Sequence, residues 1–216
     1  MGGSDAGYLS VWHYRPLDLT PTSDLYYYLF LRDAPRPLLD IGCSVGNLLS
    51  IDPERSVGID LDPHAVEVAR SRGLSADVGD LNAPLPYDER SFGCVNCRHV
   101  IEHVWQPEQL LAEIHRVLRP QGRLVLLTPD FRHAFRTFYD DHTHVRPLTR
   151  ESLRRLALEI GFRRFTIRHE VSRVGIRQLV RRGLVGAEAG RLLYQTAYAF
   201  GIRQRKTLVM VAEREA

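Results

Sequence analysis

A short apolar run that ends in a turn of small residues narrows the choice of fold more than any other part of the chain. Residues 38–41 read Leu-Leu-Asp-Ile, residues 42–46 read Gly-Cys-Ser-Val-Gly, and a second apolar run begins at Leu48. A buried parallel strand that passes into a helix has this pattern. A further apolar run ends at Asp60, about where the next strand of a nucleotide-binding βαβ unit places an acidic residue against ribose hydroxyls. We therefore expect two strand ends to converge on one nucleoside.

The turn permits two other interpretations, and the sequence disfavours both. A dinucleotide-binding Gly-x-Gly-x-x-Gly turn needs glycine where this chain has Ser44 and Asn47, so an NAD or FAD site is not expected. Residues 42–46 also match Gly-x-Ser-x-Gly, the nucleophile elbow of hydrolases, with Ser44 as the nucleophile. That elbow follows several strands of a larger sheet and needs an upstream oxyanion-hole turn. Only about forty residues precede Ser44, and none forms such a turn.

Five motifs follow one another along the chain in a recognisable order. They lie at residues 40–46 together with 58–60, and then at 76–81, 85–87, 100–104 and 113–124. Together they resemble the class I S-adenosylmethionine (SAM) dependent methyltransferases, in particular the ubiquinone-methyltransferase-like branch. The resemblance covers residues 36–130 and, more loosely, 140–170. Two positions depart from the family pattern, because Ser44 replaces the middle glycine of the first motif and Gly93 stands where the family usually has aspartate.

The resemblance implies a SAM site and assigns residues to it. Asp40 and the backbone of residues 42–46 hold the amino-acid end of SAM, and Asp60 accepts hydrogen bonds from both ribose hydroxyls. Asp80 binds the adenine edge, and two leucines enclose the base. Carboxylates suit this work because, when ionised, they are pure acceptors that form strong charge-assisted hydrogen bonds. The expected cofactor-binding residues are Asp40, Gly42, Cys43, Ser44, Gly46, Asp60, Leu61, Asp80, Leu81 and Arg98.

The pattern of the whole chain predicts an α/β fold. Short apolar runs alternate with amphipathic stretches, which is typical of a mostly parallel sheet with helices on both faces. We expect a Rossmann-like sheet of seven strands in a single domain over residues 1–216, a length that suffices for a core without disulfides or metals. The expected strands are 38–41, 57–60, 75–78, 94–98, 124–128, 163–169 and 207–212, and the expected helices begin at Gly46 or cover 63–72, 107–118 and 150–160.

Two segments lie outside this alternation of strands and helices. Residues 1–34 include an aromatic run at 26–30, and residues 172–206 lie between the last two expected strands. In the family such additions cover the cofactor and shape the acceptor pocket. We therefore expect an N-terminal lid and an inserted lid, and the alternative is that both segments only extend the core.

Charge is divided unevenly along the chain. The net formal charge is +3, but residues 1–149 carry net −6 and residues 150–206 carry net +10. The basic segment includes Arg177, Arg181 and Arg182. Such an excess indicates an acidic partner, which could be a phosphate-bearing substrate, a nucleic acid or an anionic membrane surface. The alternative is that the excess reflects composition, because the chain has 28 arginines and one lysine.

Methyl transfer to a hydroxyl needs an oriented nucleophile and a base, since the sulfonium of SAM already activates the methyl group. Histidine suits the role of base because its unperturbed pKa is about 6.5. His142 and His144 follow the fifth expected strand, at the edge where α/β sheets bind ligands, and are our candidates for base and substrate contact. His103 also follows a strand, and we assign it a structural role. With Asp140 and Asp141 the two histidines also permit a metal site, which we do not expect.

Other features argue against several classes of protein. The N-terminus has no basic start followed by an apolar core, and no window approaches the ~18 to 20 apolar residues that span a bilayer. We therefore expect a cytoplasmic location. Cys94 and Cys97 have no second pair for a zinc site and fit an apolar strand, so we expect packing residues. Residues 96–99 lack the Pro-Pro-aromatic motif of base-methylating enzymes, which argues against a nucleic-acid substrate.

These observations predict a SAM-dependent methyltransferase whose acceptor is a small molecule. The favoured acceptor atom is an oxygen of a saccharide, a natural product or a lipid-linked compound, and an anionic acceptor or peripheral contact with a membrane stays open. The alternatives are an RNA methyltransferase and a SAM-binding protein without transferase activity.

Overall fold

The computed structural model describes residues 26–171, 176, 179–180, 182–200 and 203–215 of the chain. The strands are β1 (Leu38–Ile41), β2 (Ser56–Asp60), β3 (Ala76–Val78), β4 (Phe92–Arg98), β5 (Leu118–Pro129), β6 (Arg164–Val171) and β7 (Arg203–Glu213). They form one sheet in the order β3-β2-β1-β4-β5-β7-β6. The first five strands are parallel, and β7 runs antiparallel to its neighbours β5 and β6. The predicted Rossmann-like, mostly parallel seven-stranded sheet is confirmed.

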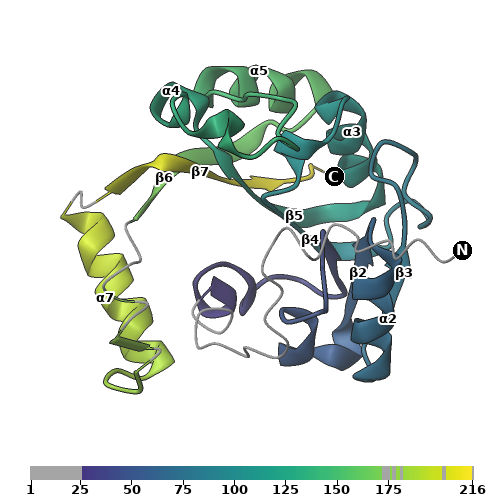
Figure 1. Ribbon diagram of the computed structural model, residues 1–216, viewed down its shortest axis with the longest axis horizontal. Coiled ribbons are helices and arrows are strands. Elements are labelled where there is room, and N and C mark those ends of the chain that lie inside the picture. The colour runs from purple at the N-terminus through teal and green to yellow at the C-terminus, as the bar shows by residue number, and fades with distance from the viewer. Residues whose placement is uncertain (1–25, 172–175, 177–178, 181, 201–202, 216) are drawn as a thin grey trace, which may run out of the picture.

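Helices cover both faces of this sheet. The helices are α2 (Pro63–Ser71), α3 (Pro107–Val117), α4 (Phe131–Ala134), α5 (Arg150–Ile160) and α7 (Ala187–Ala199). A π-helical turn, η2, covers Tyr27–Leu31, and short 3-10 turns are η3 (Leu49–Ile51), η4 (Pro53–Arg55), η5 (Ile101–His103) and η6 (Phe138–Asp140). In Figure 1, α3, α4 and α5 lie over one face of the sheet, α2 and η2 lie over the other, and α7 extends beyond β6 and β7.

Two helices begin at caps that the sequence displays. Asp62 accepts hydrogen bonds from the amides of His64 and Ala65 (2.8 and 3.3 Å) at the start of α2. Thr149 and Ser152 exchange hydrogen bonds at the start of α5, where each side chain binds the other residue's amide. Both caps end a loop that follows a strand, so they fix where the loops at this edge of the sheet stop.

The helix expected from Gly46 is replaced by irregular structure. The chain after Gly46 forms a turn and then the short turns η3 and η4. Gly46 has a φ of +76°, and Pro53 has no amide hydrogen to continue a helix. Pro53 therefore bounds the segment, and short turns take the place of the expected helix, so the prediction was wrong here.

The start of β5 also differs from the prediction, which placed it at residue 124. The strand begins at Leu118 and pairs with β4 through a register shift. Gly93 lies in this irregular stretch, and a Cβ there would lie 2.7 Å from backbone atoms of Arg36. Close backbone packing therefore explains why glycine occupies a position at which the family usually has aspartate.

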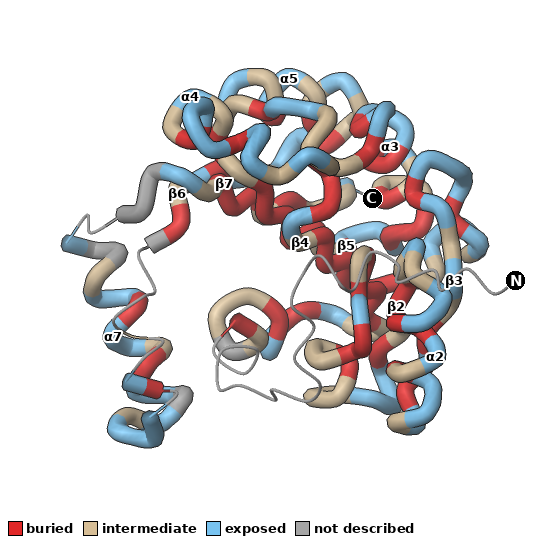
Figure 2. The backbone as a smooth tube through the Cα atoms, in the orientation of Figure 1, coloured by how far each residue is buried: buried red, intermediate tan, exposed pale blue. Residues whose placement is uncertain are grey.

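The core lies on both faces of the sheet, and Figure 2 shows the buried residues concentrated along the central strands. On one face, Leu111 and Ile114 of α3 pack with residues of α5 and of the strands. On the other face, Tyr26 packs against the sheet with the residues of η2. Cys94 and Cys97 are buried and belong to different clusters, so the prediction that they are packing residues is confirmed.

The two additions to the fold contact each other. Arg191 of α7 lies 3.6 Å from Asp33, and the rings of Tyr194 and Phe30 pack at a centroid distance of 6.4 Å. Residues 1–25 and several positions between 172 and 202 lie outside the described residues, and the lid role of both additions stays a prediction. Within the part of the chain that the structure describes, no helix is both long enough and apolar enough to cross a membrane.

Candidate functional site

The strand ends at the carboxyl edge of the sheet surround a large cavity. It has a volume of about 690 Å³ and is lined by the ends of β1, β2, β4 and β5 and by the loops that follow them. We call it the carboxyl-edge cavity. Gly42 and Ser44, directly after β1, have φ values of +74° and +49°, and Gly42 donates its amide hydrogen to Ile59 O (2.8 Å). The turn brings backbone to the cavity wall, where a Cβ on Gly42 would clash with Val100.

The carboxylate of Asp60 is oriented by backbone amides at the end of β2. Its Oδ2 accepts a hydrogen bond from the Ser44 amide (2.7 Å), and its Oδ1 accepts one from the Asp62 amide (3.0 Å). Burial raises the pKa of Asp60, and the amide hydrogen bonds oppose this effect without cancelling it. Each carboxylate oxygen has a second lone pair, so Asp60 keeps acceptor sites for two hydroxyls while its orientation is held.

A second carboxylate and two leucines form the next part of the wall. Asp80 Oδ1 accepts hydrogen bonds from the amide and the side-chain Nδ2 of Asn82 (2.9 and 3.0 Å). Asn82 in turn accepts a hydrogen bond from the Trp105 amide (2.8 Å). Leu61 is 60% exposed and Leu81 is buried. Both leucines line the cavity, so they give its wall an apolar part that suits a flat aromatic ring.

The structure places the predicted cofactor residues in two groups. The residues that line the cavity are Gly42, Ser44, Asp60, Leu61, Asp80, Leu81 and Arg98. Asp40, Cys43 and Gly46 lie behind the wall instead. Cys43 is buried close to Gly58, and Gly46 packs closely against Leu74, so these positions support the turn from behind.

Asp40 belongs to a buried chain of polar groups beneath the cavity. Asp40 and Asn96 are paired in register on β1 and β4, and Asn96 Nδ2 donates to Asp40 Oδ1 (2.6 Å). The Tyr26 hydroxyl donates to Asn96 Oδ1 (2.6 Å), and the Arg98 guanidinium lies 4.8 Å from the centre of the Tyr26 ring. Burial raises the pKa of Asp40 to about 7, although Asn96 and Arg98 act to lower it. Sequence reasoning missed Tyr26 and Asn96; an asparagine in an otherwise apolar strand was the available signal.

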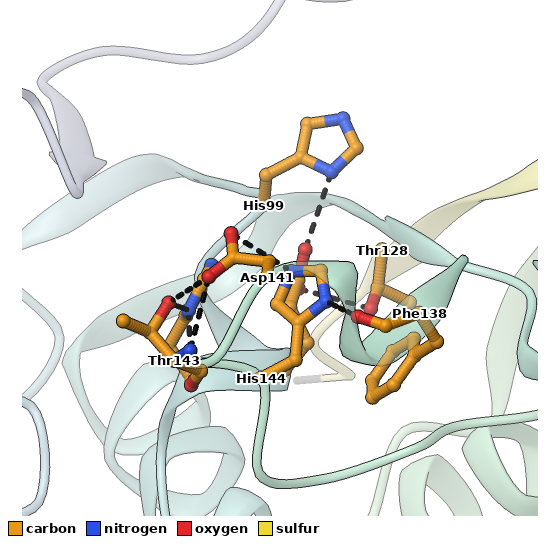
Figure 3. Close-up of polar contacts among 8 residues, drawn as sticks. His99, Thr128, Phe138, Asp141, Thr143 and His144 are labelled. Atoms are coloured by element: carbon orange, nitrogen blue, oxygen red, sulfur yellow. Dashed lines mark hydrogen bonds and ion pairs between the residues drawn. The ribbon is translucent and has the colours of Figure 1, made fainter. Parts of the chain in front are cut away.

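The two predicted histidines occupy different places. His144 lines the carboxyl-edge cavity, and its Nδ1 lies 2.6 Å from Phe138 O (Figure 3). Because a carbonyl can only accept, Nδ1 carries the proton and Nε2 is the basic nitrogen, 3.7 Å from Asp141 Oδ2. His142 is exposed and does not line the cavity. A turn closed by the His144 amide and Asp141 O turns His142 outward.

His103 lines the same cavity, although the sequence suggested only a structural role for it. Its ring lies 4.7 Å from the ring of His144. The Thr143 hydroxyl donates to Asp141 Oδ1 (2.6 Å) and therefore accepts from His103 Nδ1 (2.9 Å). This chain of hydrogen bonds holds the proton on Nδ1 and leaves Nε2 as the basic nitrogen. Burial lowers the pKa of His103, so the ring is neutral at neutral pH.

This arrangement changes which residues could hold a metal ion. Ligand atoms of Glu102, His103 and His144 lie within 4.8 Å of one another, whereas Asp140 and His142 are exposed and belong to no such cluster among the described residues. Glu102 is 1% exposed and already accepts hydrogen bonds from Thr128 (3.0 Å) and, when that ring nitrogen is protonated, from His99 (3.2 Å). Its present partners hold the β4 and β5 loops together.

Comparison with known proteins agrees with the geometry. Residues 39–126 match the family model of a methyltransferase domain. A probable S-adenosylmethionine-dependent methyltransferase of Mycolicibacterium smegmatis is 34% identical over 145 residues, covering 64% of this chain and 56% of the relative. The mitochondrial ubiquinone biosynthesis O-methyltransferase of Schizosaccharomyces pombe is 36% identical over 106 residues, covering 43% of this chain and 38% of the relative.

The fold has close counterparts among solved structures. A SAM-dependent methyltransferase from Archaeoglobus fulgidus superposes with a TM-score of 0.66 at 19% identity, over 96% of this chain and 100% of that one. Residues 39–126 therefore match a methyltransferase domain, and the chain has the fold of a SAM-dependent methyltransferase of known structure. It spans about half the length of the curated relatives it matches.

Proposed function

We propose that this protein transfers a methyl group from SAM to an oxygen of a small molecule, in the class of saccharides, natural products or lipid-linked compounds. One observation carries the proposal. Asp60, His103 and His144 line the same cavity at the ends of the strands. A nucleoside binder and a general base therefore share one space.

The hydrogen-bond acceptors and apolar residues of the cavity fit the cofactor. Asp60 would accept hydrogen bonds from the ribose hydroxyls and Asp80 from the adenine edge, and Leu61 and Leu81 would enclose the base. The missing side chain at Gly42 lets Val100 pack against the turn at the cavity wall, where a Cβ would clash with it. When bound, SAM supplies a methyl group on a sulfonium, so the task of the protein is to align an acceptor in line with it.

His103 is our candidate for the general base. Its pKa is lowered by burial, so the ring is neutral and able to accept a proton from an acceptor hydroxyl near pH 7. Thr143 and Asp141 hold the opposite nitrogen protonated, and the Asp141 carboxylate stabilises the imidazolium that forms. Burial acts to raise the pKa of Asp141, but hydrogen bonds from Thr143 outweigh it and the pKa is lowered, so this group is ionised. His144 would orient the acceptor beside it.

The preference for an oxygen acceptor rests on the candidate base, because relatives of equal identity are named an O-methyltransferase and, in Rauvolfia serpentina, a norajmaline N-methyltransferase. An anionic or lipid-linked acceptor stays part of the proposal because of the basic C-terminal segment. Arg182 is exposed, as that role requires, whereas Arg177 and Arg181 lie outside the described residues.

The test is a measurement of SAM conversion to S-adenosylhomocysteine with panels of hydroxylated acceptors, matched amines and RNA. We expect turnover with a hydroxylated small molecule and loss of most of it in His103→Ala, with SAM affinity kept. Turnover with RNA alone, or SAM binding without turnover on every panel, would contradict the proposal. His142→Ala is the matched control, since that histidine is exposed and lies outside the cavity.

A further inference from the structure

A second cavity lies beyond the end of β5. Its volume is about 810 Å³, and residues of α4, of the N-terminus of α5 and of the edge strand β6 line it. It shares no lining residue with the carboxyl-edge cavity. Pro129 lines the carboxyl-edge cavity, and the next residue, Asp130, lines this second cavity. In Figure 1, α4 and α5 lie side by side above β6. We call it the arginine cavity, after Arg132, Arg150, Arg154 and Arg168 in its wall.

A buried carboxylate orients two imidazoles in this cavity. Asp130 is 2% exposed, and its Oδ2 lies 2.9 Å from His133 Nδ1 and 2.8 Å from His169 Nε2. Burial acts to raise the pKa of Asp130, but hydrogen bonds from the two histidines outweigh it and the pKa is lowered. The ionised carboxylate thus holds one nitrogen of each ring. The opposite nitrogens, His133 Nε2 and His169 Nδ1, form no hydrogen bond with any residue that the structure describes.

The arginines outnumber the carboxylates of the wall. Glu151 is the second carboxylate, and it already pairs with Arg155 (3.0 Å) and Arg154 (3.8 Å). Within the described part of the chain, the guanidinium groups of Arg132 and Arg150 have no carboxylate partner. Cations gathered in a concave site with low-dielectric walls focus a positive potential, which attracts anions.

A metal ion is the competing occupant, because ligand atoms of Asp130, His133 and His169 lie within 4.8 Å of one another. The charges of the wall decide against it. A divalent cation at this point would be repelled by the surrounding guanidinium groups, whereas an anion would be attracted by them. The first amides of α5, at Arg150 and Glu151, add donors that also favour an anion.

We propose that the arginine cavity binds the phosphate monoester group of a small molecule. Such a group carries about −1.5 to −2 charges and three acceptor oxygens. Guanidinium forks match these oxygens in pairs, and the opposite nitrogen of each ring that Asp130 holds donates to the phosphate when that ring is protonated. A carboxylate carries a single charge and needs only one guanidinium, so it would leave most of the wall unmatched. This site is independent of the methyl-transfer function proposed above.

The test is calorimetric titration of the full chain with phenyl phosphate, inorganic phosphate, ZnCl₂ and vesicles containing phosphatidic acid. We expect phenyl phosphate to bind with a Kd below about 1 mM at low salt, and more weakly in about 0.5 M salt. The double variant Arg132→Gln, Arg150→Gln should weaken binding by about tenfold or more. Both positions are exposed, so the fold should survive. Arg164→Gln is the matched control, because Arg164 lies on β6 with a 75% exposed side chain, outside the wall.

A second measurement locates the ligand. Phenyl phosphate should shift the histidine ring Cε1–H resonances of His133 and His169 in NMR spectra and leave that of His64, at the start of α2, unchanged. Equal affinity in the double variant and in Arg164→Gln would overturn the proposal. So would binding to the vesicles without binding to phenyl phosphate, or stoichiometric Zn²⁺ binding by a protein that ignores phosphate.

Discussion

The two cavities of this domain are lined by consecutive residues, Pro129 and Asp130, but they present opposite kinds of polar group. The carboxyl-edge cavity presents acceptors, Asp60 and Asp80, on short side chains that follow central parallel strands. The arginine cavity presents donors on long side chains beside the edge strand β6. Acceptors on short side chains are positioned closely by the backbone of the strands that carry them. Donors on long side chains depend on charge, and their attraction weakens with salt.

The contrast separates two ways of building a binding site. Backbone hydrogen bonds position Asp60, so its geometry exists before any ligand arrives. The guanidinium groups of Arg132 and Arg150 are exposed and must lose side-chain freedom when they bind. Substitutions in one cavity should therefore leave the other unaffected, and the predictions below test that independence.

The largest expected effect is on the rate of methyl transfer. His103→Ala should lower the rate by about 10² to 10⁴-fold, the range of general-base catalysis, while SAM affinity and phosphate binding to the arginine cavity stay unchanged. In the unaltered protein the rate should fall as the pH drops through the lowered pKa of His103, because protonation removes the base. Steady-state kinetics across pH would show both effects. An unchanged rate in His103→Ala would transfer the role to His144.

Next in size is the pH dependence of stability that Asp40 imposes. Its folded pKa of about 7 lies above the ordinary value of 3.8, so its contribution is complete below the unfolded pKa and is lost as the pH rises toward the folded pKa. The free energy of unfolding should fall by up to about 1.4 kcal/mol per pH unit in that window. Asp40→Asn should remove this slope.

The measurement for Asp40 is urea denaturation at several pH values for the two proteins. Their difference isolates Asp40 from the other groups that titrate in the same window. Parallel stability curves would mean that Asp40 is ionised in the folded protein, and that the buried chain through Asn96 and Tyr26 holds a charge.

A smaller effect is expected on cofactor affinity. Asp60→Ala should weaken SAM binding by about 10 to 100-fold, because two hydroxyls lose a charged acceptor at roughly 1.5 to 3 kcal/mol each, less the gain from water. Calorimetry would measure it, with Asp60→Asn as a second variant that keeps the size of the side chain but replaces one acceptor oxygen by a donor. Phosphate binding should not change. Affinity equal to that of the unaltered protein would remove Asp60 from the ribose site.

The smallest predicted effect separates binding from stability. Leu61 is 60% exposed, so Leu61→Ala should change the free energy of unfolding by less than about 0.5 kcal/mol. The same change should weaken SAM binding by a few-fold, at about 25 cal/mol per Å² of apolar surface that the base would cover. Loss of stability without loss of affinity would show that Leu61 serves packing alone.

Much of the fold was predictable because its signals are local in sequence. The glycine turn after β1, the cap at Asp62 and the alternation of strands with helices predicted the sheet and the place of Asp60. The helix expected after Gly46 does not form, because Pro53 limits its length. The apolar pattern of the segment gave no sign of that limit.

The candidate site was predictable only in part. Asp60, Asp80 and the leucines follow strands directly, so their convergence at one edge could be expected. The sequence could not show whether His142 or His103 lines the cavity, because a turn of a few residues decides which side chain faces it. Nor could it show the chain from Tyr26 through Asn96 to Asp40, which needs the register of two strands distant in sequence.

The sequence by itself determined the class of fold and the carboxylates of the cofactor site, because short-range patterns and strand ends specify both. Only the tertiary structure decided the identity of the paired imidazoles and the existence of the arginine cavity. Residues 130–133, 149–154 and 165–169 are separated along the chain and carry no shared motif. Their side chains meet because β6 pairs with β7 at the sheet edge and α5 packs over it, which is a consequence of long-range packing.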